Sequence, residues 1–553
     1  MLDEWFALVR RQDINAPAPM YLTRELLPGM VARGGGHVVN MVGSRQLLRG
    51  IMPVRWFDTV CRGVARGLSR HERLHGTRMT TAATLLAELE AQLAAQRRAF
   101  ARGAPDHRRR MQALAALRDG VHARQEELVR AVSDDFGGRA HEETLLLELF
   151  PLYDQIRHAR RHLEQWMRRR PVTSAWFLQP SRAFYQYQPL GVVGVIGAWN
   201  YQLLLTLGPV VDALAAGNHV MLKPSEITPR SAEVIARIVA DAFPPEYVTC
   251  MTGGADVASA FAALPFDYLF FTGSARVGQL VMRAAAANLT PVTLELGGKS
   301  PAIVHASYPL SRAVGRIVAG KLYNAGQTCV APDYVLLLAG REAAFEAEAR
   351  RAVAALYPRL VDNPDYTRIV SRRHYDRLRG LIADAAARSA RVVELNPAAE
   401  QASADNRVLP PTLIFSPTDA MRAMQEEIFG PVLPVLTYHS LDEAISYVNA
   451  RARPLALYSF DEDARRQDAV LARTSSGGVT FNDCVFHLAQ HNLPFGGVGP
   501  SGMGQYHGFD GFVTFSKKRG VMVQRRWAAT SLLRAPWRRW RPLLDMLLWL
   551  ARR

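Results

Sequence analysis

The sequence predicts an α/β fold in which helices cover both faces of a parallel sheet. Short apolar runs with strand character each precede a helical segment, the alternation that parallel sheets produce. The clearest runs are Val192–Ile196, His219–Leu222, Tyr268–Phe271 and Pro301–Val304. A second alternating block extends from about 300 to 485, without an internal repeat. With 553 residues, we expect two or more domains and a large core.

The segment before the first of these strands is expected to be helical, because its apolar residues recur at helical spacing. The helical ranges are Leu85–Leu93, Met111–Leu117, Leu128–Val132 and Leu145–Trp166. Pro171 ends this pattern. Ala183–Gln188, with the sequence AFYQYQ, is aromatic and β-prone and is expected to form a separate strand.

Composition and cysteine usage indicate an intracellular globular protein. Hydrophobic residues make up 49% and charged residues 21%, which is ordinary for a globular enzyme. None of the four cysteines forms a C-x-x-C pair, so neither a disulfide framework nor a metal site is expected. The N-terminus has no charged start followed by an apolar run and a cleavage site, so we expect no secretory signal and a cytoplasmic location.

The formal charge of +17 is concentrated at the two ends. Residues 1–78 have 12 basic and 6 acidic side chains, and residues 517–553 have 11 basic and one acidic, which leaves +1 for residues 79–516. Because the body of the chain is nearly neutral and shows no basic face with interleaved aromatics, nucleic-acid recognition is not expected.

Cys329 lies in N-A-G-Q-T-C, where small neighbours leave its sulfur accessible. A thiolate that attacks an aldehyde carbonyl produces a tetrahedral oxyanion, which needs a hydrogen-bond donor. Asn200, in G-A-W-N, could supply that donor or could cap the following helix. Taken alone, Cys329 could equally be a small buried apolar residue.

Glu295 stands in the apolar, strand-like run of V-T-L-E-L-G-G-K-S-P. A carboxylate is costly to bury unless it is paired or used. Desolvation would raise the pKa of Glu295 and suit it to act as a general base. The alternative is an ion pair with Lys299.

Six separated motifs together resemble the aldehyde dehydrogenase family over residues of about 85 to 520. They are G-A-W-N, M-L-K-P-S-E, F-T-G-S-A-R-V-G, L-E-L-G-G-K-S-P, N-A-G-Q-T-C and E-E-I-F-G-P-V. The 34-residue interval from Glu295 to Cys329 is also typical of this family. Stretches such as GQTCVAPDYVL and LPFGGVGPSGMGQYHG are most similar to the branch of coniferyl aldehyde dehydrogenases and class 3 fatty and aromatic aldehyde dehydrogenases.

The resemblance implies a role for each motif residue. Cys329 is the expected nucleophile, Asn200 forms the oxyanion hole with the Cys329 backbone N–H, and Glu295 activates water to hydrolyse the acyl-thioester. The implied cofactor contacts are Lys223 and Glu226 for the adenosine ribose, Gly273 and Ser274 for the pyrophosphate, and Glu427 and Phe429 for the nicotinamide ribose and ring. No metal is implied.

The implied fold is Rossmann-like but lacks the G-x-G-x-x-G fingerprint, because Gly191, Gly194 and Gly197 have the wrong spacing. NAD is the expected cofactor, because Glu226 would bind a ribose 2′-hydroxyl and repel a 2′-phosphate. NADP remains open, since this branch has a relaxed cofactor choice.

The resemblance implies NAD(P)-dependent oxidation of an aldehyde to its acid, with coniferaldehyde as the first candidate and a medium- or long-chain fatty aldehyde as the alternative. Aromatic residues near the motifs could line the pocket or belong to the ordinary core. They are Trp199, Tyr201, Tyr323, Phe486 and His487. A non-catalytic scaffold that keeps the fold is the alternative of another class. A CoA-dependent acylating enzyme would be expected to lack Glu295.

The resemblance also implies a domain organisation and a homodimer. The expected segments are a cofactor-binding domain (79–181 and 190–296), a catalytic domain (297–510), a β oligomerisation extension (182–189 and 511–525) and a basic amphipathic tail (526–553). The free strand edge of the extension would pair with a second subunit.

The two ends of the chain fall outside the resemblance. Residues 14–44 weakly resemble a short-chain dehydrogenase fragment but lack its phosphate-binding glycines and Tyr-x-x-x-Lys pair, so residues 1–78 are interpreted as an appendage. Leu543–Ala551 is apolar but for Asp545, is flanked by arginines, and is shorter than the roughly 20 residues that span a bilayer. Peripheral contact with an anionic membrane, with a partner subunit or with the substrate channel remains open.

Overall fold

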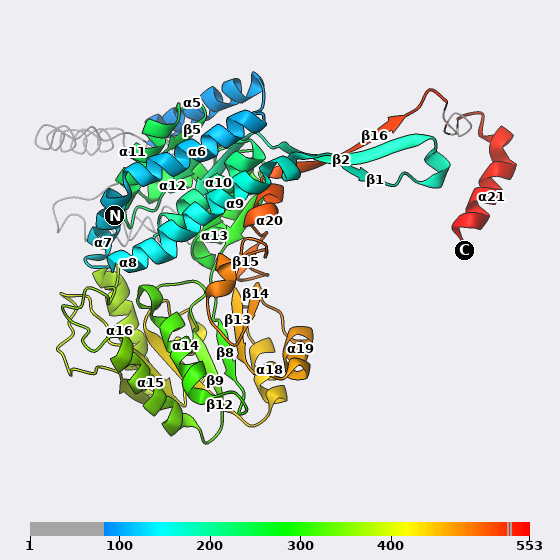
Figure 1. Ribbon diagram of the computed structural model, residues 1–553. Coiled ribbons are helices and arrows are strands. Elements are labelled where there is room, and N and C mark those ends of the chain that lie inside the picture. The colour runs from blue at the N-terminus through cyan, green and yellow to red at the C-terminus, as the bar shows by residue number, and fades with distance from the viewer. Residues whose placement is uncertain (1–81, 528–529, 531–533, 553) are drawn as a thin grey trace, which may run out of the picture. The chain divides into compact units, whose positions relative to one another are not determined.

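The computed structural model describes residues 82–527, 530 and 534–552, which contain three β-sheets and the helices around them (Figure 1). The predictions made for residues 1–78 lie outside these described residues. The mixed α/β class expected from the sequence is confirmed, and the predicted strands correspond to β3, β4, β6 and β8.

A six-stranded sheet has the order β15-β7-β6-β3-β4-β5. Its strands are β3 (Val192–Ile196), β4 (His219–Lys223), β5 (Val248–Cys250), β6 (Tyr268–Thr272), β7 (Val292–Glu295) and β15 (Gly502–Met503). Only β15 runs antiparallel to its neighbour. All five residues of β3 are buried, because helices cover both faces of a parallel sheet and its strands become continuous apolar runs.

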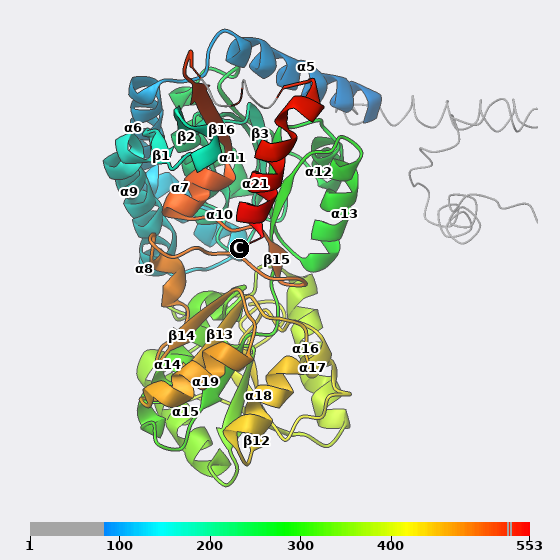
Figure 2. The same ribbon diagram turned by 90° about the vertical axis from the view of Figure 1, so that its right-hand side faces the viewer.

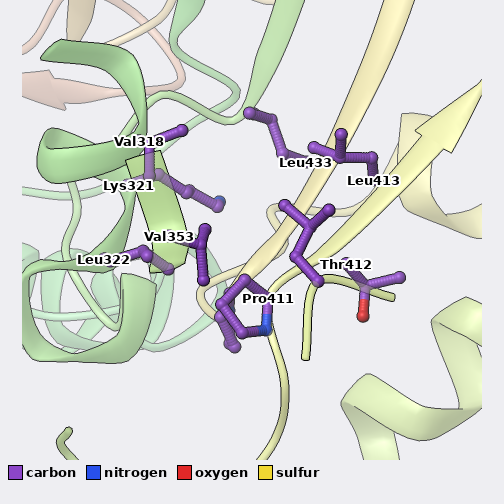
Figure 3. A pocket seen from close by; sticks show the side chains of 10 residues that line it. Val318, Lys321, Leu322, Val353, Pro411, Thr412, Leu413 and Leu433 are labelled. Atoms are coloured by element: carbon purple, nitrogen blue, oxygen red, sulfur yellow. The ribbon is translucent and has the colours of Figure 1, made fainter. Parts of the chain in front are cut away.

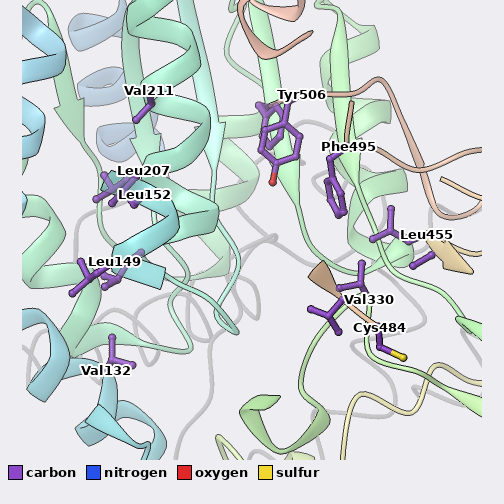
Figure 4. Close-up of a cluster of buried hydrophobic side chains, with 14 of the residues drawn as sticks. Val132, Leu149, Leu152, Leu207, Val211, Val330, Leu455, Cys484, Phe495 and Tyr506 are labelled. Atoms are coloured by element: carbon purple, nitrogen blue, oxygen red, sulfur yellow. The ribbon is translucent and has the colours of Figure 1, made fainter. Parts of the chain in front are cut away.

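Of the ten described helices associated with this sheet, the first five, α5 to α9, come from the segment predicted to be helical. They are α5 (Ala82–Ala101), α6 (His107–Ala123), α7 (Gln125–Phe136), α8 (His141–Thr144), α9 (Phe150–Met167), α10 (Leu204–Ala216), α11 (Pro229–Ala242), α12 (Ala255–Ala262), α13 (Ala275–Ala286) and α20 (Gly508–Thr514). One π-helical turn, η2 (Leu145–Leu149), joins α8 to α9, a detail that apolar spacing did not reveal. Figure 4 shows Leu149 and Leu152 packing towards Leu207 and Val211 of α10 in the buried core.

A seven-stranded sheet has the order β10-β11-β12-β9-β8-β13-β14 and is parallel except for β10. Its strands are β8 (Pro301–Val304), β9 (Tyr334–Leu338), β10 (Arg391–Glu394), β11 (Thr412–Phe415), β12 (Val432–Tyr438), β13 (Ala456–Phe460) and β14 (Gly478–Phe481). Its helices are α14 (Leu310–Leu322), α15 (Glu342–Leu356), α16 (Arg372–Ala387), α17 (Arg422–Gln425), α18 (Leu441–Asn449) and α19 (Ala464–Arg473). Figure 2 shows the layers of this part below the six-stranded sheet.

A three-stranded arm extends away from the two larger sheets (Figure 1). It contains β1 (Arg170–Val172), β2 (Ser181–Pro189) and β16 (Ser516–Gln524), and β2 pairs with β16 along nine residues. The sequence predicted β2 but not β1. In the predicted range 511–525, residues 511–514 lie in α20. After the arm come η7 (Trp537–Trp540) and α21 (Arg541–Ala551). No helix among the described residues is long and apolar enough to cross a membrane.

Candidate active site

Four neighbouring parallel strands of the six-stranded sheet end at the same edge. β7 ends at Glu295, β6 at Thr272, β3 at Ile196 and β4 at Lys223. Four motifs therefore pass this edge, namely G-A-W-N, M-L-K-P-S-E, F-T-G-S-A-R-V-G and L-E-L-G-G-K-S-P. Open α/β sheets bind their ligands at the carboxyl ends of the strands, so this edge is the place where a cofactor would bind.

The remaining motifs precede strands of the seven-stranded sheet. Cys329 lies before β9, while Glu427 and Phe429 lie before β12, and β9 pairs directly with β12. Asp333 joins the two loops, because its carboxylate accepts a hydrogen bond from the Ile428 backbone N–H at 2.9 Å and forms an ion pair with Lys299. The nucleophile candidate and the nicotinamide-side candidates are thus held by adjacent strands.

Cys329 follows a left-handed turn. Asn324, Ala325 and Gly326 have φ values of 52°, 51° and 74°. Residues with a Cβ rarely adopt this conformation, and strained backbone of this kind is concentrated at functional sites. At Gly326 a Cβ would collide with the Gly430 carbonyl, which explains the glycine. The turn ends α14 abruptly and begins the loop that carries Cys329.

The Cys329 thiol is packed among other groups but is not fully enclosed. Burial and then the carboxylates of Glu427 and Glu295 raise the pKa of the Cys329 thiol to about 12, while the N–H groups of Cys329 and Val330 oppose this shift. At neutral pH the ligand-free thiol is therefore protonated, and reaction requires a base that accepts its proton.

Asn200 is 3% exposed and lies against the Cys329 loop. Its Nδ2 donates to the Gln327 carbonyl at 3.1 Å, and Asn324 Nδ2 donates to the Asn200 carbonyl at 2.8 Å. Asn200 does not cap α10, because that helix begins at Leu204 and no side-chain cap is found at its N-cap residue. A carboxamide nitrogen has two hydrogens, so the second N–H can serve an oxyanion.

Glu295, at the end of β7, is 2% exposed, and neither of its carboxylate oxygens has a hydrogen-bond partner among the described residues. Burial raises its pKa well above the ordinary value. The alternative of an ion pair with Lys299 is wrong, because Lys299 pairs with Asp333 and donates to the carbonyls of Ala423 and Glu426. An unpaired, desolvated carboxylate beside a cysteine suits proton transfer.

The candidate cofactor residues offer separate polar contacts along this edge. Lys223 is 1% exposed, and its Nζ donates to the Pro224 carbonyl at 3.0 Å and to Glu226 Oε2 at 3.2 Å. Ser274 caps α13 by accepting from the Val277 N–H at 3.4 Å. With Gly273 directly before it, the exposed start of this 12-residue helix suits a phosphate group.

Glu427 and Phe429, the nicotinamide-side candidates, contact residues of two other motifs. Glu427 Oε1 accepts from the Gly298 N–H at 3.0 Å, and a Cβ at Gly297 would collide with this carboxylate. Burial raises the pKa of Glu427 to about 7. The Phe429 ring lies 5.3 Å from that of Trp199 and at a steep angle to it. The residues present therefore fit a dinucleotide.

The predicted pocket aromatics separate into two groups. Tyr323 and Phe486 contact each other at 6.0 Å between centroids, and Phe486 is 48% exposed, so this pair can face a substrate. Trp199 packs on Phe429 and His374 instead, and Tyr201 is buried with its hydroxyl 2.7 Å from Thr328 Oγ1. His487 Nδ1 lies 3.0 Å from Thr480 Oγ1.

Lys321 is a buried cation that sequence reasoning did not identify. It is 3% exposed, and its Nζ has no hydrogen-bond partner among the described residues. It borders a mostly apolar cavity of about 10 Å³ between α14 and the β11–β12 strands (Figure 3). This is room for roughly one water and far too little for an aldehyde.

Sequence reasoning also missed Tyr506 and a charged cluster at residues 139–148. Burial raises the pKa of Tyr506, and the charges of Glu295 and Cys329 raise it further. Figure 4 shows Tyr506 beside Phe495 in the same core. A glutamate inside the apolar run L-L-L-E-L-F was the one available sign of the cluster.

The fold and this edge define a class of α/β enzyme with two large, mostly parallel sheets, in which the candidate dinucleotide site lies on one sheet and the cysteine-bearing loop precedes a strand of the other. The family model described as "Aldehyde dehydrogenase family" matches residues 72–521, and the chain belongs to that family. It is thus an NAD(P)-dependent aldehyde dehydrogenase by family.

Relatives of known sequence agree with this assignment. The chain is 50% identical to a "probable coniferyl aldehyde dehydrogenase" of Caulobacter vibrioides over 426 residues, which are 76% of this chain and 88% of the relative. It is 48% identical to the coniferyl aldehyde dehydrogenase of a Pseudomonas species over 415 residues, which are 75% and 86% of the two chains.

Solved structures show the same fold. The substrate-bound AldH of Staphylococcus aureus is 37% identical with a TM-score of 0.75, and the match covers 79% of this chain and 94% of that one. An aldehyde dehydrogenase of Mycobacterium tuberculosis complexed with NAD⁺ is 28% identical with a TM-score of 0.71, covering 80% and 90%. An Escherichia coli NADP-dependent enzyme is also similar, at 26% identity and a TM-score of 0.72, covering 80% and 91%.

Proposed function

We propose that this chain oxidises a hydrophobic aldehyde, with coniferaldehyde as the first candidate, to its carboxylic acid, using Cys329 as the nucleophile. The observation that carries this proposal is that the Asn200 carboxamide donates to the Cys329 loop, while the unpaired, buried Glu295 carboxylate acts electrostatically on the Cys329 thiol. The relatives named as coniferyl aldehyde dehydrogenases support the substrate.

The residues suggest a sequence of proton and bond changes. The Cys329 proton passes to water, and the thiolate forms a C–S bond with the carbonyl carbon while the carbonyl oxygen becomes the oxyanion. The second Asn200 N–H and the Cys329 backbone N–H hold the oxyanion. A nicotinamide held by Glu427 and Phe429 would supply the acceptor for the hydride that leaves this carbon, and the oxyanion would close to the thioester carbonyl. Glu295 then takes a proton from water, the water oxygen attacks the thioester carbon, and the C–S bond breaks.

NAD is the proposed cofactor, and NADP is the alternative. Lys223 and Glu226 would hold the adenosine ribose, Gly273 and Ser274 the pyrophosphate, and Glu427 and Phe429 the nicotinamide ribose and ring. The Glu226 carboxylate is partly exposed and would repel a 2′-phosphate. Replacing it by glutamine should therefore raise kcat/KM with NADP relative to NAD.

The first experiment measures reduced cofactor from coniferaldehyde, benzaldehyde and hexadecanal, each with NAD and with NADP. We expect wild-type turnover to be highest with coniferaldehyde and NAD, and Cys329→Ala to lose turnover. Cys250→Ala is the matched control, since this partly buried thiol lies at the end of β5. Highest kcat/KM for hexadecanal would support the fatty-aldehyde alternative, and no pre-steady-state burst with any aldehyde would support the scaffold.

We further propose that the arm forms the contact in a homodimer. β16 pairs with β2 on one side only, so its other edge can add to a sheet of a second copy. Light scattering of the full chain should give twice the mass of 61.3 kDa. A monomeric mass at micromolar concentration would refute this assembly.

The C-terminal helix α21 is proposed to contact anionic membranes. Arg541, Asp545 and Arg552 share one narrow face at helical spacing, and the other face is apolar with no buried residue. The full chain should sediment with vesicles of equal phosphatidylglycerol and phosphatidylcholine, and a chain lacking residues 534–553 should not. Absence of binding by the full chain would end this proposal.

A further inference from the structure

A buried charged cluster lies directly behind the residues proposed to react. The side chains of Arg139 and Glu148 have no solvent exposure, and that of Glu143 is 11% exposed. Arg139 Nη1 donates to Glu148 Oε1 at 2.7 Å, and its Nε lies 3.5 Å from Glu143 Oε2. Because burying an ion pair often costs as much as it returns, stability alone does not account for this cluster.

Glu148 is placed by the π-helical turn η2. Such turns insert one extra residue into a helix and occur frequently at functional sites. Glu148 Oε2 accepts from the backbone N–H groups of Leu203 at 2.7 Å and Leu204 at 3.4 Å. Glu148 thereby accepts hydrogen bonds from backbone N–H groups at the start of α10, three residues after Asn200, as a capping side chain would.

Arg139 connects the cluster to both partners of the oxyanion hole. Its Nη1 lies 3.4 Å from the Asn200 carbonyl as a donor. Its guanidinium lies over the Tyr201 ring, 5.0 Å from the centroid. The Tyr201 hydroxyl in turn lies 2.7 Å from Thr328 Oγ1, on the residue next to Cys329.

Glu143 holds the other side of the site. Its Oε1 accepts from the Asn324 backbone N–H at 2.6 Å, and its Oε2 accepts from Thr367 Oγ1 at 2.5 Å. Asn324 is the first residue of the left-handed turn that leads to Cys329. The same cluster therefore restrains the loop of the oxyanion donor and the loop of the nucleophile.

We propose that Arg139, Glu143 and Glu148 are positioning residues, which fix the Asn200 carboxamide relative to the Cys329 thiol through their contacts with the Asn200 carbonyl and the Asn324 N–H. This inference rests on the proposed function. None of the three touches substrate or cofactor in it. A shift of about 1 Å in a reacting group lowers rates by up to roughly 100-fold, so loosening this restraint lowers kcat more than it changes KM.

The test uses the full chain with Arg139→Lys and with the double variant Arg139→Met/Glu148→Gln. The lysine keeps the charge but loses the guanidinium fork that reaches Asn200. The double variant removes the buried charge pair, while the carboxamide oxygen introduced by Glu148→Gln can still accept from the Leu203 N–H. We expect kcat to fall by about 10- to 100-fold in the double variant, with KM for aldehyde and NAD within about threefold.

A second readout is independent of turnover. Iodoacetamide alkylation of Cys329, measured without cofactor by mass spectrometry, should slow in both variants, because a looser turn supports the thiolate less well through the N–H groups of Cys329 and Val330. Arg110→Lys is the matched control, a buried arginine whose guanidinium donates to the carbonyls of Pro105 and Ala215, away from the site. It should lower the melting temperature and leave kcat and alkylation unchanged.

Two results would overturn the inference. One is that both Arg139 variants have the same kcat and the same alkylation rate as the wild type. The other is a kcat that falls with the melting temperature equally in the Arg110 and Arg139 variants, which indicates a merely structural role. If the wild type oxidises no aldehyde but the Arg139 variants still alkylate more slowly, the proposed function fails while the positioning role stands.

Discussion

Replacing Lys321 by methionine should stabilise the protein at neutral pH. Burial lowers the pKa of Lys321 to about 8 from 10.5, although Asp333 opposes the shift. Since one pKa unit corresponds to about 1.36 kcal/mol, the buried charge costs about 3 kcal/mol of folding free energy at pH 7. Methionine has a similar shape, has no charge and suits the apolar walls of the cavity.

The pH dependence gives this prediction its sign. The folded-state pKa lies below the unfolded value, so the penalty is complete below about pH 8, shrinks between pH 8 and 10.5 and is absent above that range. The gain from Lys321→Met should therefore be about 3 kcal/mol at pH 7 and should shrink towards pH 10.

Urea unfolding followed by fluorescence at pH 7 and at pH 9.5 measures this gain. Lys517→Met, at an exposed position on β16, is the control and should change the unfolding free energy by less than about 0.5 kcal/mol. A Lys321→Met variant that is less stable than wild type at pH 7, or a gain that is the same at both pH values, would refute the reasoning. The first result would mean that Lys321 has a favourable partner in solution, and the second that its charge is not the source of the gain.

The remaining predictions concern the site. Glu295→Gln should keep the first burst of reduced cofactor but lose steady turnover, and loss of the burst in rapid-mixing experiments would contradict the assignment. Since burial raises the pKa of Glu295, the wild-type kcat should decrease as the pH is lowered, and this decrease should begin at a pH above the ordinary carboxyl range. The pKa of Glu427 is about 7, so KM for NAD should rise as the pH falls through 7, and this dependence should disappear in Glu427→Gln. Gly297→Ala, whose Cβ would displace the Glu427 carboxylate, should raise KM for NAD several-fold and leave KM for the aldehyde unchanged. An unchanged KM for NAD would contradict the role of Glu427 in NAD binding.

Sequence reasoning predicted the elements of the fold whose pattern lies within one short stretch of sequence. Strands such as β3 and β6 are continuous apolar runs because helices cover both faces of the sheet, so they can be recognised without tertiary information. β5 and β1 have three residues each, and so short a run has no distinctive pattern. The π turn at Leu145–Leu149 is a shift of one residue inside a helical pattern, which apolar spacing cannot resolve.

The candidate site was predictable where a motif carries the residue and unpredictable where a contact joins distant segments. Cys329, Glu295 and Asn200 stand in compact motifs, and the structure brings Asn200 within hydrogen-bond distance of the Cys329 loop. Glu143 and Asn324 are 181 positions apart, and nothing in either neighbourhood indicates the other. Lys299 shows the same limit, because its actual partner Asp333 lies 34 residues away and the nearer Glu295 was the natural guess.

The arm and the six-stranded sheet both depend on the final part of the described chain. β15 pairs Gly502 with Glu295, and β16 supplies the long partner of β2, whose residues are some 330 positions earlier. During synthesis the first 500 residues therefore emerge before β16 can pair with β2 and before β15 can pair with β7, the strand that ends at Glu295. Long-range pairing of this kind is slow, and unpaired edges invite association with other chains. A chain that ends shortly before residue 516 would contain most of the core but leave this edge of β2 open, so the final strand protects the newly made protein from edge-to-edge association.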